Sequence, residues 1–533
     1  QRTLSFRAAV DFDDLVGLAL MTLELDPQYL ARLQERWVYI LEDEAQDSSR
    51  LQEKMLRLLT KERNWVRVGD PNQAINTTFT TADSEYLVRF LAEKGVVDRK
   101  LPVSGRSGQP IINLANELVR WTMHDHPVTE LRGAFYEQYI KPTEPDDPQQ
   151  NPPADETRIH IHYQPDMPVS PERELELVRD SLVKWLPENP DKTVALLVPE
   201  NSRGFKLAEI LRTANIDYEE LLRSTTGTRV AASYLCSILN YLAAPHDSNA
   251  LGRFYREVWL PLSVGPAMED DPDYERVNRA LVAVRFLEEL VWSDVPVVET
   301  LKLDELNPAV ESDLLGFLEF VRYCLAALAL PIDQLILTIG QRIFTQPVEI
   351  ALTYKISALL RRFALENSLW RLTDFVSELR SIVDNQRRFI GFEDSSEGYS
   401  PSPGLPTIST MHAAKGLEWD RVYLLGVSNY GFPSVQPYDD YVSERWFVES
   451  RLSVVDEALE QFYALLADRR YLESVATYEA RLAYSAERLR LLYVAMTRAR
   501  RDLVVTWNIG RYSAVSGVQN RLAMPVLGIM DII

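Results

Sequence analysis

Three short runs rich in β-forming residues end directly in polar or charged side chains, and this pattern constrains the fold more than any other feature of the sequence. The runs are residues 37–41, 65–68 and 407–411, and each has the composition of a β-strand. Polar groups that follow buried parallel strands gather at one edge of the sheet, where α/β proteins bind their ligands. The sequence therefore predicts an α/β fold with a functional site at that edge.

The length and charge of the chain limit what it can be. With 533 residues it exceeds a single hydrophobic core, so we expect a few domains. Its net charge of −21 argues against a nucleic-acid partner unless basic residues are concentrated locally. Residues 481–511 hold seven arginines against Glu487 and Asp502, which is compatible with a polyanion held in one cleft. The alternative is a solvated helix face.

The cysteines and the hydropathy pattern indicate the cellular compartment in which the chain is expected to work. Cys236 and Cys324 are too few and too far apart to form a disulfide or metal framework, which fits a reducing, cytoplasmic setting. No apolar run reaches the roughly 18 residues that a membrane span needs, and no signal peptide is visible. We therefore expect no membrane partner.

The run 37–41 continues into a cluster of carboxylates. At the edge of a sheet, Asp43 can hold Mg²⁺ and Glu44 can orient or deprotonate an attacking water. The alternative is an acidic helix start, which the helix dipole favours. Clustered acids directly after an apolar strand are unusual for capping alone, so the pattern favours a catalytic role.

Two further loops carry polar or aromatic candidates. Gln73, after the second run, can sense a terminal phosphate or position a water, and Phe79 can stack on a base or fill the core. Arg106 precedes an amphipathic helix, from where its guanidinium can reach a phosphate held between domains. Arg498 would project from the end of a predicted helix over 487–501, near the loop that follows residues 407–411.

The stretch 407–427 is a predicted strand, polar loop and strand. Lys415, Gly416 and Glu418 supply the cation, the glycine and the carboxylate that a phosphate-and-ribose site needs. The alternative, equally open from this stretch alone, is an ordinary strand-turn-helix corner.

Composition divides the chain into segments. Residues 1–140 form one predicted α/β segment, and the proline-rich stretch 141–157 is a linker. Residues 158–230 and 405–533 make a second α/β domain, which residues 231–404 interrupt as an all-helical insertion with a second linker at its end. Within these segments, 193–198 is a predicted buried strand, and helices are predicted over 8–35, with an acidic start at Asp11, and over 275–291, 312–330, 356–380 and 438–480.

Taken in order, these stretches resemble the UvrD/Rep/PcrA group of superfamily 1 DNA helicases. Five segments carry the resemblance, and five in the right order are more specific than any one of them. They are 43–47, similar to the Walker B segment (motif II), 68–73 (motif III), 105–107 (motif IV), 410–418 (motif V) and 493–499 (motif VI).

The resemblance implies two RecA-like domains of the P-loop NTPase type, with a large all-helical insertion in the second. It also implies ATP and Mg²⁺ as cofactors and single-stranded DNA and duplex/single-strand junctions as partners. The implied roles are Mg²⁺ binding for Asp43, general base for Glu44, γ-phosphate or water contact for Gln73, arginine fingers for Arg106 and Arg498, nucleotide binding for Gly416 and Glu418, DNA-backbone contact for Thr410 and His412, and base stacking for Phe79.

Three departures from the family pattern stand out. No Gly-x-x-x-x-Gly-Lys-Ser/Thr is present, so we expect a fragment without the Walker A segment that hydrolyses ATP poorly by itself. Gly105 stands where the family usually has a tyrosine that stacks on adenine. Asn76 and Thr77 lie near the position of the usual aromatic pair after motif III.

The sequence as a whole predicts an ATP-dependent motor that moves 3′-to-5′ on single-stranded DNA and unwinds duplexes. One alternative is the motor portion of a RecB-like helicase-nuclease. Another is a remnant that binds DNA or a protein without turnover, which absence of a Walker A segment from the complete gene product would favour. Retention of Asp43, Glu44, Gln73, Arg106 and Arg498 argues against such a remnant.

Overall fold

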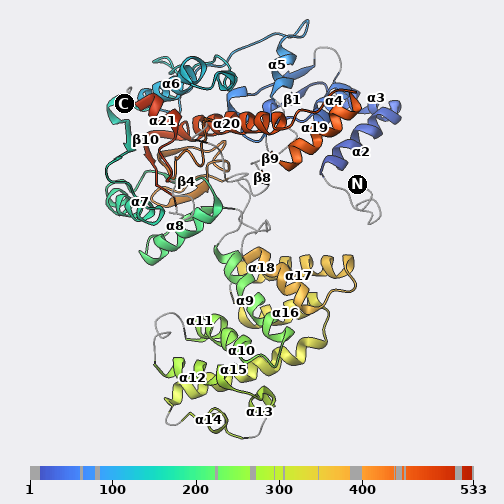
Figure 1. The fold of residues 1–533 in the computed structure, drawn as a ribbon, viewed down its shortest axis with the longest axis vertical. Helices are drawn as coiled ribbons and strands as arrows, with labels where there is room; N and C mark the ends of the chain where they lie inside the picture. The colour runs from blue at the N-terminus through green and yellow to red at the C-terminus, as the bar shows by residue number, and fades with distance from the viewer. Residues whose placement is uncertain are drawn as a thin grey trace. The chain divides into compact units, whose positions relative to one another are not determined.

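The computed structural model describes residues 12–60, 64–77, 84–222, 226–264, 272–292, 295–303, 306–345, 347–383, 399–436, 439, 447–448, 452–510 and 519–530 (Figure 1). The chain divides into two units, Gln1–Glu220 with Ser400–Ile533, and Leu221–Tyr399. The first unit is therefore built from two stretches that are distant in sequence. Among the described residues, no helix has the length and apolar character needed to cross a membrane.

The first unit contains a small parallel sheet that carries two of the predicted strand ends. In it β1 (Ile40–Glu42) pairs with β2 (Trp65–Arg67), and Glu42 lies opposite Arg67. The prediction of strands at both places is confirmed, although both are shorter than predicted. The neighbouring helices in sequence are α2 (Phe12–Leu25), α3 (Pro27–Arg36), α4 (Arg50–Leu59) and α5 (Glu85–Leu91).

Two details predicted for this part are wrong. A single helix over 8–35 was expected, but α2 ends at Leu25, because Asp26 caps α3 by accepting from the Tyr29 amide at 2.8 Å and Pro27 has no N–H to extend α2. The strand over 37–41 was expected to be buried, but Leu41 is 75% exposed.

A larger sheet forms the centre of the first unit. Its strand order is β3 (Arg158–His162), β10 (Ala499–Thr506), β7 (Trp419–Leu424), β4 (Val194–Val198), β6 (Pro406–Thr410) and β5 (Glu219–Leu221). The pairs from β3 through β6 are parallel. All five residues of β4 are buried, as expected for a central strand of a parallel sheet. Helix α8 (Asn201–Thr213) packs on β4 and β6, and α7 (Pro171–Trp185) packs beside α8. The predicted α/β class is confirmed.

The end of the predicted helix 487–501 is wrong. Helix α20 spans Val475–Met496, and residues 499–501 belong to β10. The strand begins here because Ala499 is fully buried opposite Trp419, whose amide also donates to the Arg498 carbonyl at 3.0 Å. Arg498 is therefore in the turn between helix and strand.

The remaining elements of the first unit frame these sheets. Helix α6 (Gln109–Asp125) follows the predicted Arg106 loop, and α21 (Met524–Ile529) packs near it. The segment 438–480 was predicted to be helical throughout, but its described residues include the hairpin β8 (Phe447–Val448) and β9 (Leu452–Ser453) before α19 (Val454–Leu466). That part of the prediction is wrong.

The second unit is helical in its described residues after β5 ends at Leu221. Its core is one apolar cluster contributed by helices from α9 to α18. Predicted helices over 275–291 and 356–380 are each two helices in the structure. The helices are α9 (Thr226–Ala243), α10 (Ser248–Phe254), α11 (Leu260–Ser263), α12 (Pro272–Ala283), α13 (Leu287–Trp292), α14 (Val297–Thr300), α15 (Pro308–Ala326), α16 (Ile332–Ile343), α17 (Pro347–Glu366) and α18 (Leu372–Val383).

Candidate functional site

A tight turn carries the two predicted carboxylates at the end of β1. Glu44 has a left-handed backbone with φ 51° and ψ 38°, which is uncommon for a residue with a side chain. The Asp43 carboxylate accepts from the Glu44 amide at 2.9 Å and is otherwise turned to solvent. Conformations of this kind are held only where the surroundings determine them, and they concentrate at functional sites.

Gln46 ties this turn to the loop after β2. Its side chain is fully buried, donates to the Glu44 carboxylate and accepts from the Asp70 amide at 3.0 Å. A Cβ on Gly69 would lie 2.5 Å from Gln46 Oε1 and 3.0 Å from the Ala45 nitrogen, so only glycine allows the two loops to approach this closely. Gln46 has no role among the residues predicted from the sequence, and its place between Glu44 and Asp47 is the signal that indicates one.

Lys415 brings a cation from the larger sheet to the acidic turn. Its Nζ lies 3.0 Å from Glu44 Oε2 and 2.7 Å from Asp47 Oδ2, and its side chain is only 13% exposed. Burial raises the pKa of the Glu44 carboxyl, but the hydrogen bond and charge of Lys415 lower it by more, so the pKa lies below its ordinary value. Glu44 is thus ionised and can accept a proton once Lys415 releases it.

The predicted Gln73 is held by the loop that it belongs to. Its side-chain amide donates to Asp70 Oδ2 at 2.9 Å, while Asp70 Oδ1 accepts from the Asn72 amide at 2.9 Å and the Gln138 side chain at 3.2 Å. Burial raises the pKa of Asp70 above its ordinary value. Asp70 therefore positions Gln73 at the edge of a cavity.

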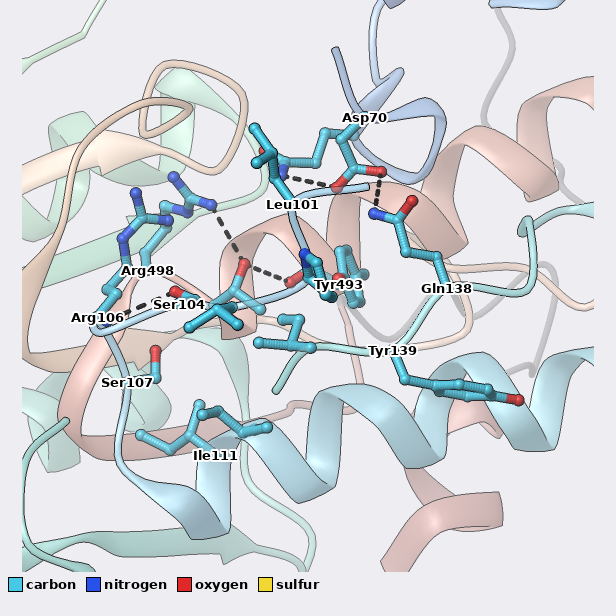
Figure 2. Close-up of a pocket in the computed structure, with 16 residues that line it drawn as sticks. Asp70, Leu101, Ser104, Arg106, Ser107, Ile111, Gln138, Tyr139, Tyr493 and Arg498 are labelled. Atoms are coloured by element: carbon cyan, nitrogen blue, oxygen red, sulfur yellow. Dashed lines mark hydrogen bonds between the residues drawn. The ribbon is translucent and has the colours of Figure 1, made fainter. Parts of the chain in front are cut away.

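This cavity has a volume of about 120 Å³ and is lined by both stretches of the first unit. Figure 2 shows Arg106 and Arg498 on one side and Asp70 and Gln138 on the other. Three of the predicted site residues, Gln73, Arg106 and Arg498, are among its lining. Residues predicted from separate motifs thus meet at one cavity.

Arg106 contacts another predicted site residue directly. Its Nε lies 2.7 Å from Glu418 Oε2, and both side chains are about one-third exposed, at 30% and 33%. Arg500 Nε is 3.8 Å from the other oxygen of the same carboxylate. Glu418 therefore holds the Arg106 guanidinium at the cavity, and an anion that binds Arg106 competes with this carboxylate.

Arg498 is the most buried cation of the site. Only 1% of the residue is exposed, and its guanidinium donates to the carbonyls of Val494 and Leu417, at 2.9 and 3.3 Å, and to the Thr497 hydroxyl. Burial first, and then the nearby charge of Arg106, lowers the pKa of Arg498 to about 9. A buried cation whose hydrogen bonds go to neutral oxygens is stabilised by an incoming anion.

The loop after β6 holds three further predicted residues. Thr410 ends β6, and its hydroxyl accepts from the Ala413 amide at 3.2 Å, while the His412 carbonyl accepts from the Lys415 amide at 3.2 Å. Gly416 has φ 84°, the left-handed region that favours glycine. The turn thus places Lys415 toward Glu44. Phe79 and the predicted helix start at Asp11 lie outside the described residues.

Gly105 packs directly against residues 141–157, the segment predicted as a linker. A Cβ on Gly105 would be 2.1 Å from the Gln149 carbonyl oxygen. The Asn151 side chain also donates to the carbonyls of Ser104 and Ser107, at 2.7 and 2.8 Å. The backbone of the 141–157 segment therefore occupies the space into which a tyrosine at position 105 would extend.

The residues present are suited to a nucleotide phosphate and a magnesium ion. Arg498 is a buried cation bonded to neutral oxygens, and Asp43 offers an exposed carboxylate, which suits Mg²⁺ because that ion is usually bound by one or two carboxylates plus phosphate and water. Within the described residues, no group of three or more histidine, cysteine, aspartate or glutamate side chains forms a complete metal cage. A metal at Asp43 would thus need ligands from a bound phosphate.

Two protein-family models match the chain. The UvrD/REP helicase N-terminal domain matches residues 1–94, and the UvrD-like helicase C-terminal domain matches residues 393–510. Together with the fold, these two matches make the chain similar to the UvrD-like helicases. With the PcrA relatives described next, they support a UvrD/Rep/PcrA-type helicase of superfamily 1.

Curated relatives are similar over most of the chain. The ATP-dependent DNA helicase PcrA of Staphylococcus aureus is 25% identical over 455 residues, which cover 82% of this chain and 55% of that protein. The protein of the same name from Staphylococcus epidermidis is 25% identical over 474 residues, 83% of this chain and 57% of the relative. The chain thus spans about half the length of the curated relatives it matches.

Proposed function

We propose that this chain is part of an ATP-dependent DNA helicase that translocates 3′-to-5′ on single-stranded DNA and unwinds duplexes at single-strand junctions. The observation that carries the proposal is the meeting of Glu44 and Gln73, from the N-terminal family match, with Lys415 and Arg498, from the C-terminal match. A site shared by two halves can convert a change at the nucleotide into relative motion.

Each side chain has a role that its position supports. Asp43 would hold Mg²⁺, and Glu44 would act as the general base after exchange of its Lys415 partner. Gln73, fixed by Asp70, would orient the attacking water, and Arg106 and Arg498 would stabilise charge on the transferred phosphoryl group. When bound, Mg²⁺–ATP supplies the phosphoanhydride bond whose hydrolysis drives the cycle.

The other predicted features belong to the same proposal. Residues 1–140 would be part of a first RecA-like domain, residues 158–230 and 405–533 a second, and residues 231–404 an accessory insertion. Gly416 and Glu418 would contact the nucleotide, Thr410 and His412 the DNA backbone, and Phe79 a base. The proposal also implies that the protein acts on DNA in the cytoplasm, for example in DNA repair.

A hydrolysis-deficient DNA-binding form of the 533-residue chain is the second candidate. It is favoured by the printed sequence, which holds no Gly-x-x-x-x-Gly-Lys-Ser/Thr to cradle phosphates. The motor portion of a RecB-like helicase-nuclease is the third, and a nuclease activity in the complete gene product would identify it.

Unwinding assays distinguish these functions. The complete gene product is incubated with duplexes that carry a 3′ or a 5′ single-stranded tail, with and without ATP. The proposal predicts ATP-dependent unwinding of the 3′-tailed duplex only, and single-stranded-DNA binding by the 533-residue chain. Unwinding from the 5′ tail contradicts the direction, and DNA binding without any unwinding by the complete product supports the non-hydrolysing form instead.

A further inference from the structure

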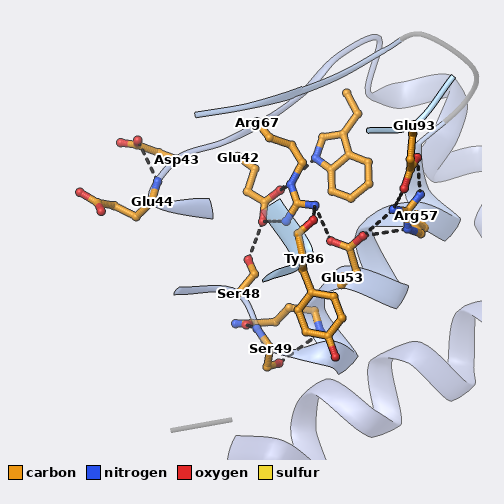
Figure 3. Close-up of polar contacts among 12 residues, drawn as sticks. Glu42, Asp43, Glu44, Ser48, Ser49, Glu53, Arg57, Arg67, Tyr86 and Glu93 are labelled. Carbon is orange, nitrogen blue, oxygen red and sulfur yellow. Dashed lines mark hydrogen bonds and ion pairs between the residues drawn. The ribbon is translucent and has the colours of Figure 1, made fainter. Parts of the chain in front are cut away.

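An ion pair lies buried between the two strands that carry the acidic turn and the Gln73 loop. Arg67 Nε lies 2.6 Å from Glu42 Oε2, and the two side chains are 0% and 8% exposed. They are register partners across β1 and β2. Figure 3 shows the Glu42 carboxylate facing the Arg67 guanidinium, with Asp43 and Glu44 beyond the end of the strand. The pair is therefore adjacent in sequence to the proposed catalytic residues.

A second carboxylate and two rings complete the surroundings of Arg67. Its Nη1 lies 2.6 Å from Glu53 Oε2, and its guanidinium carbon lies 4.6 Å from the centre of the Trp65 ring and 5.1 Å from that of Phe90. Buried ion pairs contribute little net stability compared with apolar residues of the same size, since both charges lose their hydration. Their geometric specificity, in contrast, is high.

Glu42 also contacts the far end of the acidic turn. Its Oε1 accepts from the Ser48 hydroxyl at 2.5 Å, and its Oε2 accepts from the Trp65 indole at 3.1 Å. Residues 42 and 48 flank the turn that contains Asp43 and Glu44. The carboxylate of Glu42 thus joins the two ends of the turn and fixes them to β2 through Arg67.

The backbone connects the same elements. The Val68 amide donates to the Glu42 carbonyl at 2.8 Å, and the Val68 carbonyl accepts from the Ala45 amide at 2.9 Å. Displacement of Glu42 from Arg67 would therefore move the turn relative to the Gly69–Gln73 loop. A displacement of about 1 Å at a catalytic group can lower a rate about 100-fold.

We propose that Glu42, held by Arg67 and Ser48, is a positioning residue for Asp43 and Glu44. This inference rests on the proposed hydrolysis at Glu44. The Glu42–Arg67–Ser48 clamp holds Glu44 in its left-handed conformation and sets the distance between its carboxylate and the Gln73 loop.

The first test uses hydrogen exchange on the 533-residue chain and needs no activity. In Glu42→Gln and Ser48→Ala variants, amides of residues 43–47 should exchange about tenfold faster, because a hydrogen bond to a charged acceptor is lost or weakened. The melting temperature of Ser48→Ala should stay within a few degrees of the wild type, whereas that of Glu42→Gln should fall further because Arg67 loses one of its two buried carboxylates. The control is Glu93→Gln, since Glu93 pairs with Arg57 at the half-exposed end of the same network. Unchanged exchange in both test variants would overturn the proposal.

The second test measures hydrolysis by the complete gene product. Ser48→Ala, which leaves the buried charges paired, should lower kcat about tenfold or more with KM for ATP little changed, because only the position of catalytic groups changes. A purely structural role predicts normal kcat per folded molecule. If Glu44→Gln abolishes hydrolysis while Ser48→Ala and Glu42→Gln retain wild-type kcat, this inference fails alone. If Glu44→Gln itself retains hydrolysis, the proposed function fails.

Discussion

The ammonium group of Lys415 lies 3.0 Å from the carboxylate of Glu44, and it joins the turn after β6 to the turn after β1. The same ammonium group lies 2.7 Å from Asp47. One cation in the turn after β6 therefore pairs with two carboxylates in the turn after β1. This contact accounts for the lowered pKa of Glu44, since burial alone would raise it.

Replacement of Lys415 by methionine should remove the lowering of the Glu44 pKa. The difference in free energy of unfolding between the wild type and this variant should therefore depend on pH. The pKa of Glu44 lies below its ordinary value of 4.5 in the folded chain, so the stabilisation is complete above that value and is lost as the pH falls through the folded-state pKa. We expect the wild type to be more stable by at most about 1 kcal/mol near neutral pH, because Glu44 is half-exposed. Urea denaturation of both chains across acidic pH measures the difference.

The control for this experiment is Lys192→Met. Lys192 lies 3.9 Å from Asp191, whose side chain is 78% exposed, so its loss should produce no comparable change below pH 4.5. A difference between wild type and Lys415→Met that does not diminish in acid would contradict the assignment.

Gly69→Ala should destabilise the first unit. The new methyl group would lie 2.5 Å from Gln46 Oε1 and 3.0 Å from the Ala45 nitrogen, so the two loops must move apart. Such overpacking costs about 1–3 kcal/mol. Gly17→Ala is the matched control, because a Cβ on Gly17 in helix α2 would meet nothing within 4 Å. Alanine is favoured over glycine in a helix, so this variant should gain up to about 1 kcal/mol in free energy of unfolding. Equal urea midpoints for the two variants would refute this reading of Gly69.

Gly105→Tyr should detach the segment around Gln149 and leave α6 in place. A side chain at position 105 collides with the Gln149 carbonyl, so the segment must leave its contacts with Ser104 and Ser107. We expect new protease cleavage between residues 141 and 157. Gly133→Ala, where a Cβ meets nothing within 4 Å, should show the wild-type pattern. Wild-type resistance of the tyrosine variant would show that the segment is not packed on Gly105.

Polyphosphate should stabilise the chain through Arg498. Anion binding offsets the cost of a buried cation, so inorganic tripolyphosphate should raise the melting temperature of the wild type, with about 2.7 kcal/mol available at a hundredfold excess over Kd. Arg498→Met should lose this rise. Arg501→Met serves as the control, because Arg501 pairs with Glu156 and does not line the cavity. An equal rise in all three chains would indicate non-specific binding and contradict the role given to Arg498.

The predictable part of the fold is the part where the local pattern and the tertiary environment agree. Strand β4 is apolar along its whole length and fully buried, and β6 is rich in β-forming residues and buried except at Thr410, so both were predicted correctly. The break at Asp26 and Pro27 was also readable from the sequence, because proline is favoured at the first position of a helix, but the apolar periodicity of 8–35 obscured it. The end of α20 was not readable, since the pairing of Ala499 with Trp419 depends on a distant strand.

The same distinction applies to the candidate site. Ordered segments predicted that Gln73, Arg106 and Arg498 belong together, and they line one cavity. The pairing of Glu44 with Lys415, the bridge from Gln46 to Asp70 and the packing of Gln149 on Gly105 join residues far apart in the chain or depend on exact loop paths. A sequence pattern that identifies residue types cannot specify such contacts.

The most direct test of the account is single-stranded-DNA-stimulated ATP hydrolysis by the complete gene product. Wild type is compared with Glu44→Gln and with Glu176→Gln, an exposed carboxylate on α7 that pairs with Arg173. The account predicts that DNA stimulates hydrolysis in the wild type and the Glu176 variant, and that Glu44→Gln loses at least about 100-fold in kcat, as expected for a general base. DNA-stimulated hydrolysis at the wild-type rate in the Glu44 variant would contradict the site described above.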